Sequence, residues 1–370
     1  MMEQKRLGDI ATYINGFAFK PEDRGTVGLP IIRIQDLTGN TYDLGFYDGN
    51  YPERIEINDG DVLISWSASL GVYVWNKGKA LLNQHIFKVA FDKCEVNREY
   101  FVYAVRYKLK EMESKTHGAT MKHIVKKDFD NTLIPFPAFD EQRRIAESLD
   151  TAYAIITARQ QQLQNLDELV KARFVELFGD CKSMVSMNEL CSIITDGTHQ
   201  PPRFQESGIP FIFVSNLVGN VVTYNAEKFI SEDTYAELYK RTPIEIGDLL
   251  LSTVGSYGHP AVVTEDRKFL FQRHIAYLKP RHNMVNSFYL HSALLAPDGQ
   301  RQIEEKVKGI AQKTLNLSEI KKIVVPLPTI EEQNQFEQFV NRVDKSKVAV
   351  QKSLDEAQLL FDSLMQQYFG

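Results

Sequence analysis

Hydrophobic and polar positions alternate in two different ways along this 370-residue chain. In residues 1–140, and again in residues 180–331, short β-branched and aromatic runs are separated by turns rich in Gly, Pro, Asn and Asp, as is typical of short strands. The predicted strands are Leu29–Ile34, Asp61–Trp66, Val72–Trp75 and Ile86–Phe91, then Pro210–Val214, Asp248–Thr253 and Ile275–Leu278. Helical patterns at Arg98–Met112 and Asn286–Leu295 lie between them. Each region therefore predicts an α+β fold with a mixed, mostly antiparallel sheet of short strands.

A seven-residue repeat follows each α+β region, in residues 141–179 and 332–370. Pro135 and Pro137 favour an extended connector before the first repeat, and no Gly or Pro then occurs until Gly179. The first seam is Leu149, Ile156, Leu163, Val170 and Leu177, flanked by Ile145, Ala152, Arg159, Leu166 and Arg173; the second is Val340, Lys347, Leu354, Phe361 and Tyr368, flanked by Phe336, Val343, Val350, Ala357 and Leu364. This pattern indicates two coiled-coil helices, each about 50 Å long.

The two halves of the chain are copies of each other, at an offset that drifts from 180 to 191 residues. The repeated segments pair Gly28–Ile34 with Gly208–Val214, Gly60–Ser65 with Gly247–Ser252, Asn83–Ile86 with Gln272–Ile275, and Ile134–Pro137 with Val325–Pro328. Because neither long helix can bury its seam alone, we expect the two to pair as an antiparallel coiled coil. The domains expected are an α+β region (1–140), a helix (141–179), a second α+β region (180–331) and a second helix (332–370).

Composition fits an ordinary globular protein, with 43% hydrophobic and 25% charged residues. The chain contains no run of 18 apolar residues, so no membrane-spanning helix is predicted. The first residues lack the apolar stretch of a secretion signal. The three cysteines, Cys94, Cys181 and Cys191, show no Cys-x-x-Cys spacing. They therefore argue against a disulfide framework or a zinc site and favour a reducing cytoplasm.

Net charge is −5, yet one basic cluster recurs in both copies. Residues 106–127 carry a local charge of +5, and the corresponding residues 301–322 carry +3. A solvated helical face is one interpretation of these clusters, and contact with nucleic acid is the other.

Catalytic and cofactor motifs are missing from the sequence. No phosphate-binding Gly-x-x-x-x-Gly-Lys motif occurs, and His85 and His274 lack nearby metal-ligand partners, so we expect no catalytic residues and no metal. These two histidines are interpreted either as structural residues or as polar contacts to a ligand. Gln200-Pro-Pro-Arg203 is interpreted as a loop turn.

Polar residues suited to nucleic acid recur on loops beside the strands. Asn, Gln, Arg and Lys can pair with base edges, whereas Ser, Thr and Lys suit phosphates. The candidate DNA contacts in the first copy are Ser65, Ser67, Ser69, Asn83, Gln84, His85, Lys115, Lys122, His123, Lys126 and Lys127. Those in the second copy are Ser252, Thr253, Ser256, Tyr257, Gln272, Arg273, His274, Lys306, Lys308 and Lys313. These regions differ most between the copies. We therefore expect two DNA-reading regions that share one backbone frame and recognise different base sequences.

The ordered set of motifs resembles the DNA-specificity subunit of type I restriction–modification systems over nearly the whole chain. The motifs are Gly60–Ser65, Leu82–His85, Gly118–Thr120, Ile134–Pro137 and Glu141–Ile145, with their second copies. The second copy departs from the usual residues at Gly309–Ala311 and at Gln272-Arg273, which affects which positions contact DNA.

The resemblance implies a non-catalytic protein that binds double-stranded DNA at a bipartite, interrupted site. Each α+β region would be a target-recognition domain, and the long helices would set the spacing and dock two methyltransferase subunits. A restriction subunit would complete the complex, and S-adenosylmethionine, ATP and Mg²⁺ would be expected only on the partners. Two alternatives remain: the same module in another restriction or phage-defence system, and an enzyme acting alone, such as a nuclease.

Overall fold

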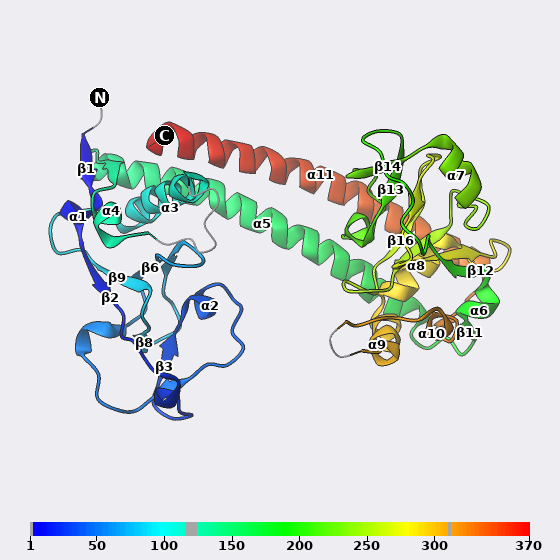
Figure 1. Cartoon of the computed structure of the whole chain (residues 1–370), viewed down its shortest axis with the longest axis horizontal. Coiled ribbons are helices and arrows are strands. Elements are labelled where there is room, and N and C mark those ends of the chain that lie inside the picture. The colour runs from blue at the N-terminus through cyan, green and yellow to red at the C-terminus, as the bar shows by residue number, and fades with distance from the viewer. Residues whose placement is uncertain (1–2, 116–123, 310–311) are drawn as a thin grey trace. The chain divides into compact units, whose positions relative to one another are not determined.

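The computed structural model describes residues 3–115, 124–309 and 312–370, in two compact units (Figure 1). Unit 1 comprises Met1–Ala158 with Ser353–Gly370, and unit 2 comprises Arg159–Lys352. Each unit therefore combines one α+β region with a part of both long helices.

Unit 1 contains short strands and short helices in alternation. Its strands are β1 (Gln4–Arg6), β2 (Thr12–Asn15), β3 (Leu29–Ile32), β4 (Phe46–Tyr47), β5 (Glu56–Ile57), β6 (Val62–Ser65), β7 (Gly71–Val74), β8 (Ala80–Leu82), β9 (Ile86–Ala90) and β10 (Leu133–Pro135). Its helices are α1 (Leu7–Ile10), η1 (Pro21–Asp23), α2 (Ile34–Leu37), η2 (Glu53–Ile55), α3 (Arg98–Lys115), α4 (Lys126–Asp130) and the first part of α5 (Phe139–Phe178).

Unit 2 has a similar, though not identical, succession of strands and short helices. Its strands are β11 (Met184–Ser186), β12 (Cys191–Asp196), β13 (Ile209–Ile212), β14 (Lys228–Ile230), β15 (Leu249–Ser252), β16 (Pro260–Val262), β17 (Leu270–Phe271), β18 (Ile275–Pro280) and β19 (Val324–Pro326). Its helices are α6 (Met187–Leu190), η3 (Val214–Leu217), α7 (Glu232–Leu238), α8 (Ser287–Leu295), α9 (Pro297–Lys306), α10 (Leu317–Ile320) and the first part of α11 (Ile330–Phe369).

The sheets of the two units have similar topologies, although the second sheet has the order β4-β3-β8-β5 in unit 1 and only β14-β13-β17 in unit 2. A four-stranded antiparallel sheet has the order β2-β9-β6-β7 in unit 1 and β12-β18-β15-β16 in unit 2. A second sheet contains the parallel pair β3–β8 in unit 1 and β13–β17 in unit 2. A third sheet has two strands, β1 and β10 in unit 1 and β11 and β19 in unit 2, and it includes Pro135 or Pro326. The α+β class with mostly antiparallel, short-stranded sheets is therefore confirmed.

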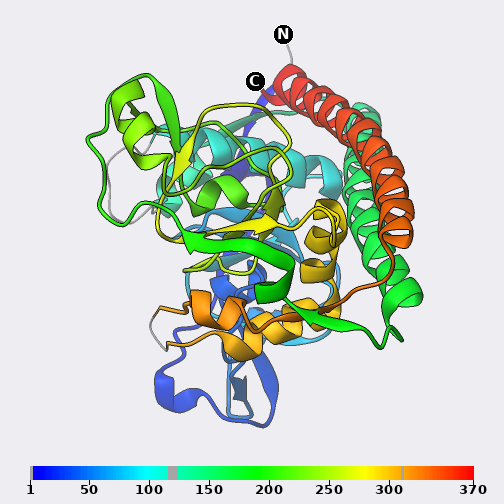
Figure 2. The ribbon, with the colours of Figure 1, turned by 90° about the vertical axis from the view of Figure 1, so that its right-hand side faces the viewer.

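The long helices pack against each other in antiparallel fashion within each unit. In unit 1 the early part of α5, at Leu149 and Ile156, shares a core with the late part of α11, at Phe361 and Phe369. In unit 2 the order is reversed along both helices, because the Phe174 ring of α5 lies 5.5 Å from the Phe336 ring of α11. Figures 1 and 2 show α5 and α11 side by side in this unit. Both long helices therefore pack against the core of each α+β region.

Leu177 corrects the predicted seam at the end of α5. Its side chain is 45% exposed, and the neighbouring Phe174 and Phe178 are buried instead. A straight α-helix drifts by about 20° for each heptad relative to a strict seven-residue repeat. After four heptads the buried face has therefore moved by about one residue. Phe369, one residue beyond the seam position Tyr368, is buried in α11 for the same reason.

A buried glutamine joins each long helix to its α+β region. Gln142 Oε1 accepts from the Asn97 backbone N–H at 2.9 Å, and its Nε2 donates to the Pro137 carbonyl at 2.9 Å. Gln333 makes the same pair of contacts, with the Asn286 N–H at 2.8 Å and the Pro328 carbonyl at 3.0 Å. One amide thus fixes the proline connector, the start of the long helix and the start of a domain helix. This is the physical reason for the recurring Glu-Gln motif.

Candidate nucleic-acid interface

Three segments that are distant in sequence meet beside the antiparallel sheet of unit 2. They are the β15–β16 loop (253–259), the turn between β17 and β18 (272–274), and the segment 312–316. The Thr253 N–H donates to the His274 carbonyl at 2.9 Å, and the Leu315 N–H donates to the Thr253 carbonyl at 2.8 Å. Backbone hydrogen bonds therefore position the loops, which leaves their side chains free to differ.

Unit 1 assembles the corresponding segments in the same way. The Trp66 N–H donates to the His85 carbonyl at 3.3 Å, and the Ile124 N–H donates to the Trp66 carbonyl at 3.0 Å. We call these segments the reading cluster of each unit: residues 66–70 and 83–85 with Ile124 in unit 1, and the three segments given above in unit 2. Most of the predicted contacts lie on these clusters.

Two glycines missed by the sequence analysis allow each cluster to close. A Cβ atom on Gly16 would lie 2.0 Å from the Asn83 carbonyl oxygen, and one on Gly197 would lie 2.2 Å from the Phe271 oxygen. The following residues, Phe17 and Thr198, pair with the turn, as their carbonyls accept from the Gln84 and Arg273 N–H groups at 2.9 and 3.1 Å. The recurrence of Gly16 and Gly197 at an offset of 181 was the available signal.

Several predicted contact residues are buried and hold their loops. Ser65 is fully buried and donates its hydroxyl hydrogen to the Ser69 carbonyl at 2.6 Å. Its counterpart Ser252, also fully buried, accepts from the His259 N–H at 2.9 Å. Ser67 and Thr253 are less than a tenth exposed. These hydroxyl groups shape the turns, whereas Ser69 and Ser256 at the loop tips are exposed.

The turn Asn83-Gln84-His85 presents unsatisfied polar atoms. His85 adopts a left-handed backbone with φ +73°, and its ring packs edge-on against Trp66 at 5.0 Å. Within the described part of the chain, Asn83 Oδ1 and His85 Nδ1 are buried without a hydrogen-bond partner. Buried polar atoms usually have a hydrogen-bond partner, and an unpaired one is costly.

In unit 2 the reading cluster encloses a cleft of about 290 Å³. Thr253, Arg273 and His274 line it together with Asp196 and Asn316. Arg273 is exposed, and its Nε lies 3.4 Å from His274 Nε2. Burial and then the charge of Arg273 lower the pKa of His274, which favours the neutral imidazole. The predicted neighbour Gln272 is half-buried at the edge of this turn.

The predicted lysine contacts have different surroundings. Lys126 is bonded to Asp130 Oδ2 at 2.7 Å, while Lys127 beside it is exposed. Lys308 lies 3.6 Å from Glu319, Lys313 lies 3.1 Å from Glu304, and Lys306 is half-buried. Lys115 ends α3, with its side chain outside the description, and Lys122 and His123 lie outside the described residues.

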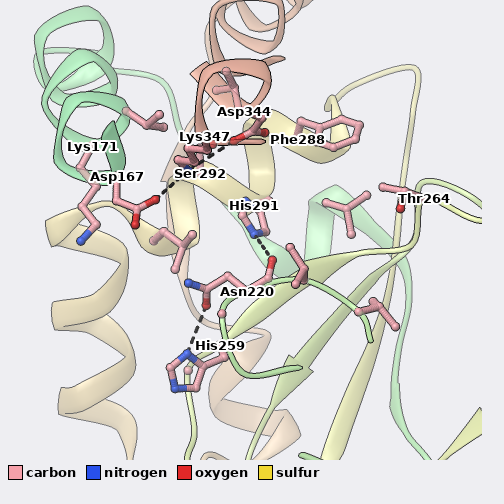
Figure 3. A pocket seen from close by; sticks show the side chains of 18 of the residues that line it. Asp167, Lys171, Asn220, His259, Thr264, Phe288, His291, Ser292, Asp344 and Lys347 are labelled. Atoms are coloured by element: carbon pink, nitrogen blue, oxygen red, sulfur yellow. Dashed lines mark hydrogen bonds and ion pairs between the residues drawn. The ribbon is translucent and has the colours of Figure 1, made fainter. Parts of the chain in front are cut away.

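A second hollow in unit 2 has a different character. It measures about 370 Å³ and is lined by α5, α8, α11 and the loop around Asn220 (Figure 3). His259 Nδ1 lies 3.2 Å from Asn220 Oδ1, and His291 Nε2 lies 3.1 Å from the Asn220 carbonyl. Lys347 bridges Asp167 and Asp344 at 2.6 and 3.3 Å across the helices. Among the described residues, none of the predicted DNA contacts lines this hollow.

The described residues contain no group of three or more His, Cys, Asp or Glu side chains that could hold a metal ion. Over the same part of the chain, no helix is both long enough and apolar enough to cross a membrane.

Comparison with known proteins identifies one family over both copies. The model of the family "Type I restriction modification DNA specificity domain" matches residues 1–168 and 183–357. The type I restriction enzyme EcoBI specificity subunit of Escherichia coli is 28% identical, covering 97% of this chain and 83% of that protein. The EcoKI specificity subunit of Escherichia coli K12 is 24% identical, covering 97% and 86%.

Solved structures show the same fold. A chain from a structural study of complex assembly and conformational transition of the type I R-M system has a TM-score of 0.58 at 18% identity, covering 99% of this chain and 97% of that one. The type I restriction–modification S subunit from M. genitalium has a TM-score of 0.50 at 15% identity, covering 100% and 96%.

Proposed function

Because the chain belongs to the type I restriction modification DNA specificity domain family, we propose that it reads a bipartite, interrupted DNA site. Each reading cluster contacts one half of the site, and the chain itself performs no chemistry. Its role is to bring methyltransferase and restriction subunits to that sequence.

The observation that carries this proposal is the shared backbone of the two reading clusters combined with their different side chains. Trp66 and Thr253 make the same backbone hydrogen bonds, and so do Gln84 and Arg273. The residues in the reading turn are Asn83-Gln84-His85 in one unit and Gln272-Arg273-His274 in the other. A fixed frame with variable polar side chains suits the recognition of two different base sequences.

The partners follow from the family rather than from any contact in this chain. We expect two methyltransferase subunits to dock on the long helices and restriction subunits to join the complex. S-adenosylmethionine, ATP and Mg²⁺ would then be bound by these partners. The net charge of −5 supports this division, because the partners can supply much of the phosphate neutralisation.

A domain exchange tests the proposal. Residues 187–330 are replaced by the corresponding region of another family member, and the complex with its methyltransferase is expressed in a host lacking such systems. Methylome sequencing should show one half-site changed, with the other half-site and the spacer retained. A change in both half-sites, or in neither, would contradict the assignment of one reader to each α+β region.

The alternative of an enzyme acting alone has a direct test. The purified chain is incubated with plasmid DNA, Mg²⁺, ATP and S-adenosylmethionine. We expect neither cleavage nor methylation until methyltransferase and restriction subunits are added. Activity of the chain alone, abolished by a point substitution in it, would support the enzyme instead.

A further inference from the structure

The side chain of Glu304, on α9, lies between two of the predicted DNA contacts of unit 2. The Tyr257 hydroxyl donates to Glu304 Oε2, and Lys313 Nζ lies 3.1 Å from Oε1. Lys313 Nζ is also 3.3 Å from the Tyr257 hydroxyl oxygen. Each carboxylate oxygen therefore accepts from one donor, and the two donors contact each other.

This trio lies on the unit 2 reading cluster. Tyr257 belongs to the β15–β16 loop and Lys313 to the segment 312–316, and the backbone N–H of Gly255 donates to the Lys313 carbonyl at 3.3 Å. Lys308 and Thr314 exchange two backbone hydrogen bonds, of 2.9 and 2.8 Å, which position the backbone next to Lys313. The trio thus stands beside the cleft that Thr253, Arg273 and His274 line.

A hydroxyl group and an ammonium group are common donors to DNA phosphates. A carboxylate offers two anionic oxygens on one carbon, much as a phosphodiester offers two on one phosphorus. Both donors of this pair are therefore already satisfied by an anion that belongs to the protein. The same contacts lower the pKa of Glu304 and raise that of Lys313, so both remain charged near neutral pH.

We propose that Glu304 tunes the affinity for DNA by competing with a DNA phosphate for Tyr257 and Lys313. The inference rests on the proposed DNA-binding function and adds to it. The Lys313 and Glu304 side chains are 53% and 61% exposed, and an exposed ion pair is weak. A phosphate that reaches these two donors must first displace the carboxylate, so a duplex that makes this contact loses the free energy of the Glu304 interactions. Glu304 thereby lowers the affinity of the chain for DNA.

The neighbouring residue Glu305 provides a matched control. It lies on the same helix and carries the same charge, but it pairs with Arg301 at 2.7 Å and contacts neither donor. The Tyr257–Glu304–Lys313 trio is particular to unit 2, because the first copy has Leu70 where the second has Tyr257.

The experiment uses the complex of the chain with its methyltransferase subunits, and two duplexes of equal length, with and without the site mapped by methylome sequencing. Fluorescence anisotropy gives affinities over a range of KCl concentrations. With Glu304→Gln, non-specific affinity should rise about threefold to tenfold at low salt. The slope of log K against log salt should steepen by up to about one unit. The affinity for the duplex with the site should rise by at least a similar factor, and Glu305→Gln should change both affinities less than Glu304→Gln does.

A double-mutant cycle tests the proposal independently. Lys313→Met should cost more affinity in the Glu304→Gln background than in the wild type, because only there is the lysine free for phosphate. Unchanged or weaker binding by a folded Glu304→Gln complex would overturn the inference and leave Glu304 as a brace for the loop. An effect of Glu305→Gln equal to that of Glu304→Gln would overturn it too. If the wild-type complex failed to discriminate the two duplexes, the proposed function itself would fail.

Discussion

Several polar residues shared by the two copies hold the frame. Asp61 Oδ2 and Asp248 Oδ2 each accept the backbone N–H three residues earlier, both at 2.8 Å. Gln142 and Gln333 tie the long helices to the α+β regions. The recurring Gly-Asp and Glu-Gln motifs are therefore structural, and they explain why a search for chemistry at these positions finds none.

We predict that Gln142→Ala and Gln333→Ala each destabilise the protein. Each substitution leaves a buried backbone N–H and a carbonyl without their partner, at a cost of about 1–3 kcal/mol for each unsatisfied group. Urea unfolding followed by circular dichroism measures the loss. The controls are Arg143→Ala and Gln335→Ala, which change exposed neighbours on the same helices. Equal stability of Gln142→Ala and Arg143→Ala would mean that the amide does not hold the junction.

His291 should make stability depend on pH. Burial lowers its pKa below the ordinary value of 6.5, opposed by the Asn220 carbonyl. As the pH falls through 6.5, the unfolded chain binds a proton at His291 that the folded chain does not bind. The free energy of unfolding is therefore greatest above this pH and falls below it. The loss is about 1.4 kcal/mol for each pH unit until the folded-state pKa is reached.

Thermal unfolding between pH 7.5 and 5.5 tests this expectation. His291→Gln keeps a donor for the Asn220 carbonyl and should flatten the decline. His282→Gln, which changes an exposed histidine, should keep the wild-type profile. A His291→Gln protein that declines as steeply as the wild type would assign the pH dependence to other groups.

At the scale of elements, the long helices contribute to the cores of both units. The seam residues Leu149 and Ile156 are buried in unit 1 with Phe361, and the half-buried Val170 packs in unit 2 with Val340. Between these cores the α5 stretch Gln160–Gln164 is mostly exposed and polar, with Leu163 half-buried. This stretch is the place where helix length can change without damage to either core.

Four residues inserted at Gln160–Gln164 should change the preferred spacer between half-sites. One added turn lengthens α5 by about 6 Å, and B-DNA rises about 3.4 Å for each base pair. Methylome sequencing should therefore show a spacer altered by about one or two base pairs, with both half-sites unchanged. Replacing Gln160, Gln161, Gln162 and Gln164 with Glu, without a change in length, should leave the spacer as it was. Altered half-sites with an unchanged spacer would refute the role of the helices as a ruler.

At the scale of the whole molecule, the duplication predicts two equivalent docking surfaces for methyltransferase subunits. The family model matches both halves of the chain, and each unit carries the same junction of a buried glutamine with a long helix. Native mass spectrometry of the reconstituted complex should show two methyltransferase subunits for each chain. A saturated complex with one methyltransferase subunit would mean that only one copy kept its docking surface.

The sequence by itself determined the duplication, the α+β class, seven of the strands and the two long helices. Local patterns sufficed for these because period-two and period-seven hydrophobicity are properties of neighbouring residues. The heptad pattern failed only at Leu177, where the accumulated drift of a straight helix moved the buried face to Phe174 and Phe178.

The tertiary structure alone decided which polar residues stand free. Ser65 and Ser252 carry hydroxyl groups that suit phosphate contacts, but both residues are fully buried in their turns. Gly16 and Gly197 close the reading clusters from far away in the sequence, and Glu304 of α9 neutralises Lys313. Exposure and charge pairing depend on segments that meet only after folding, so no local pattern records them.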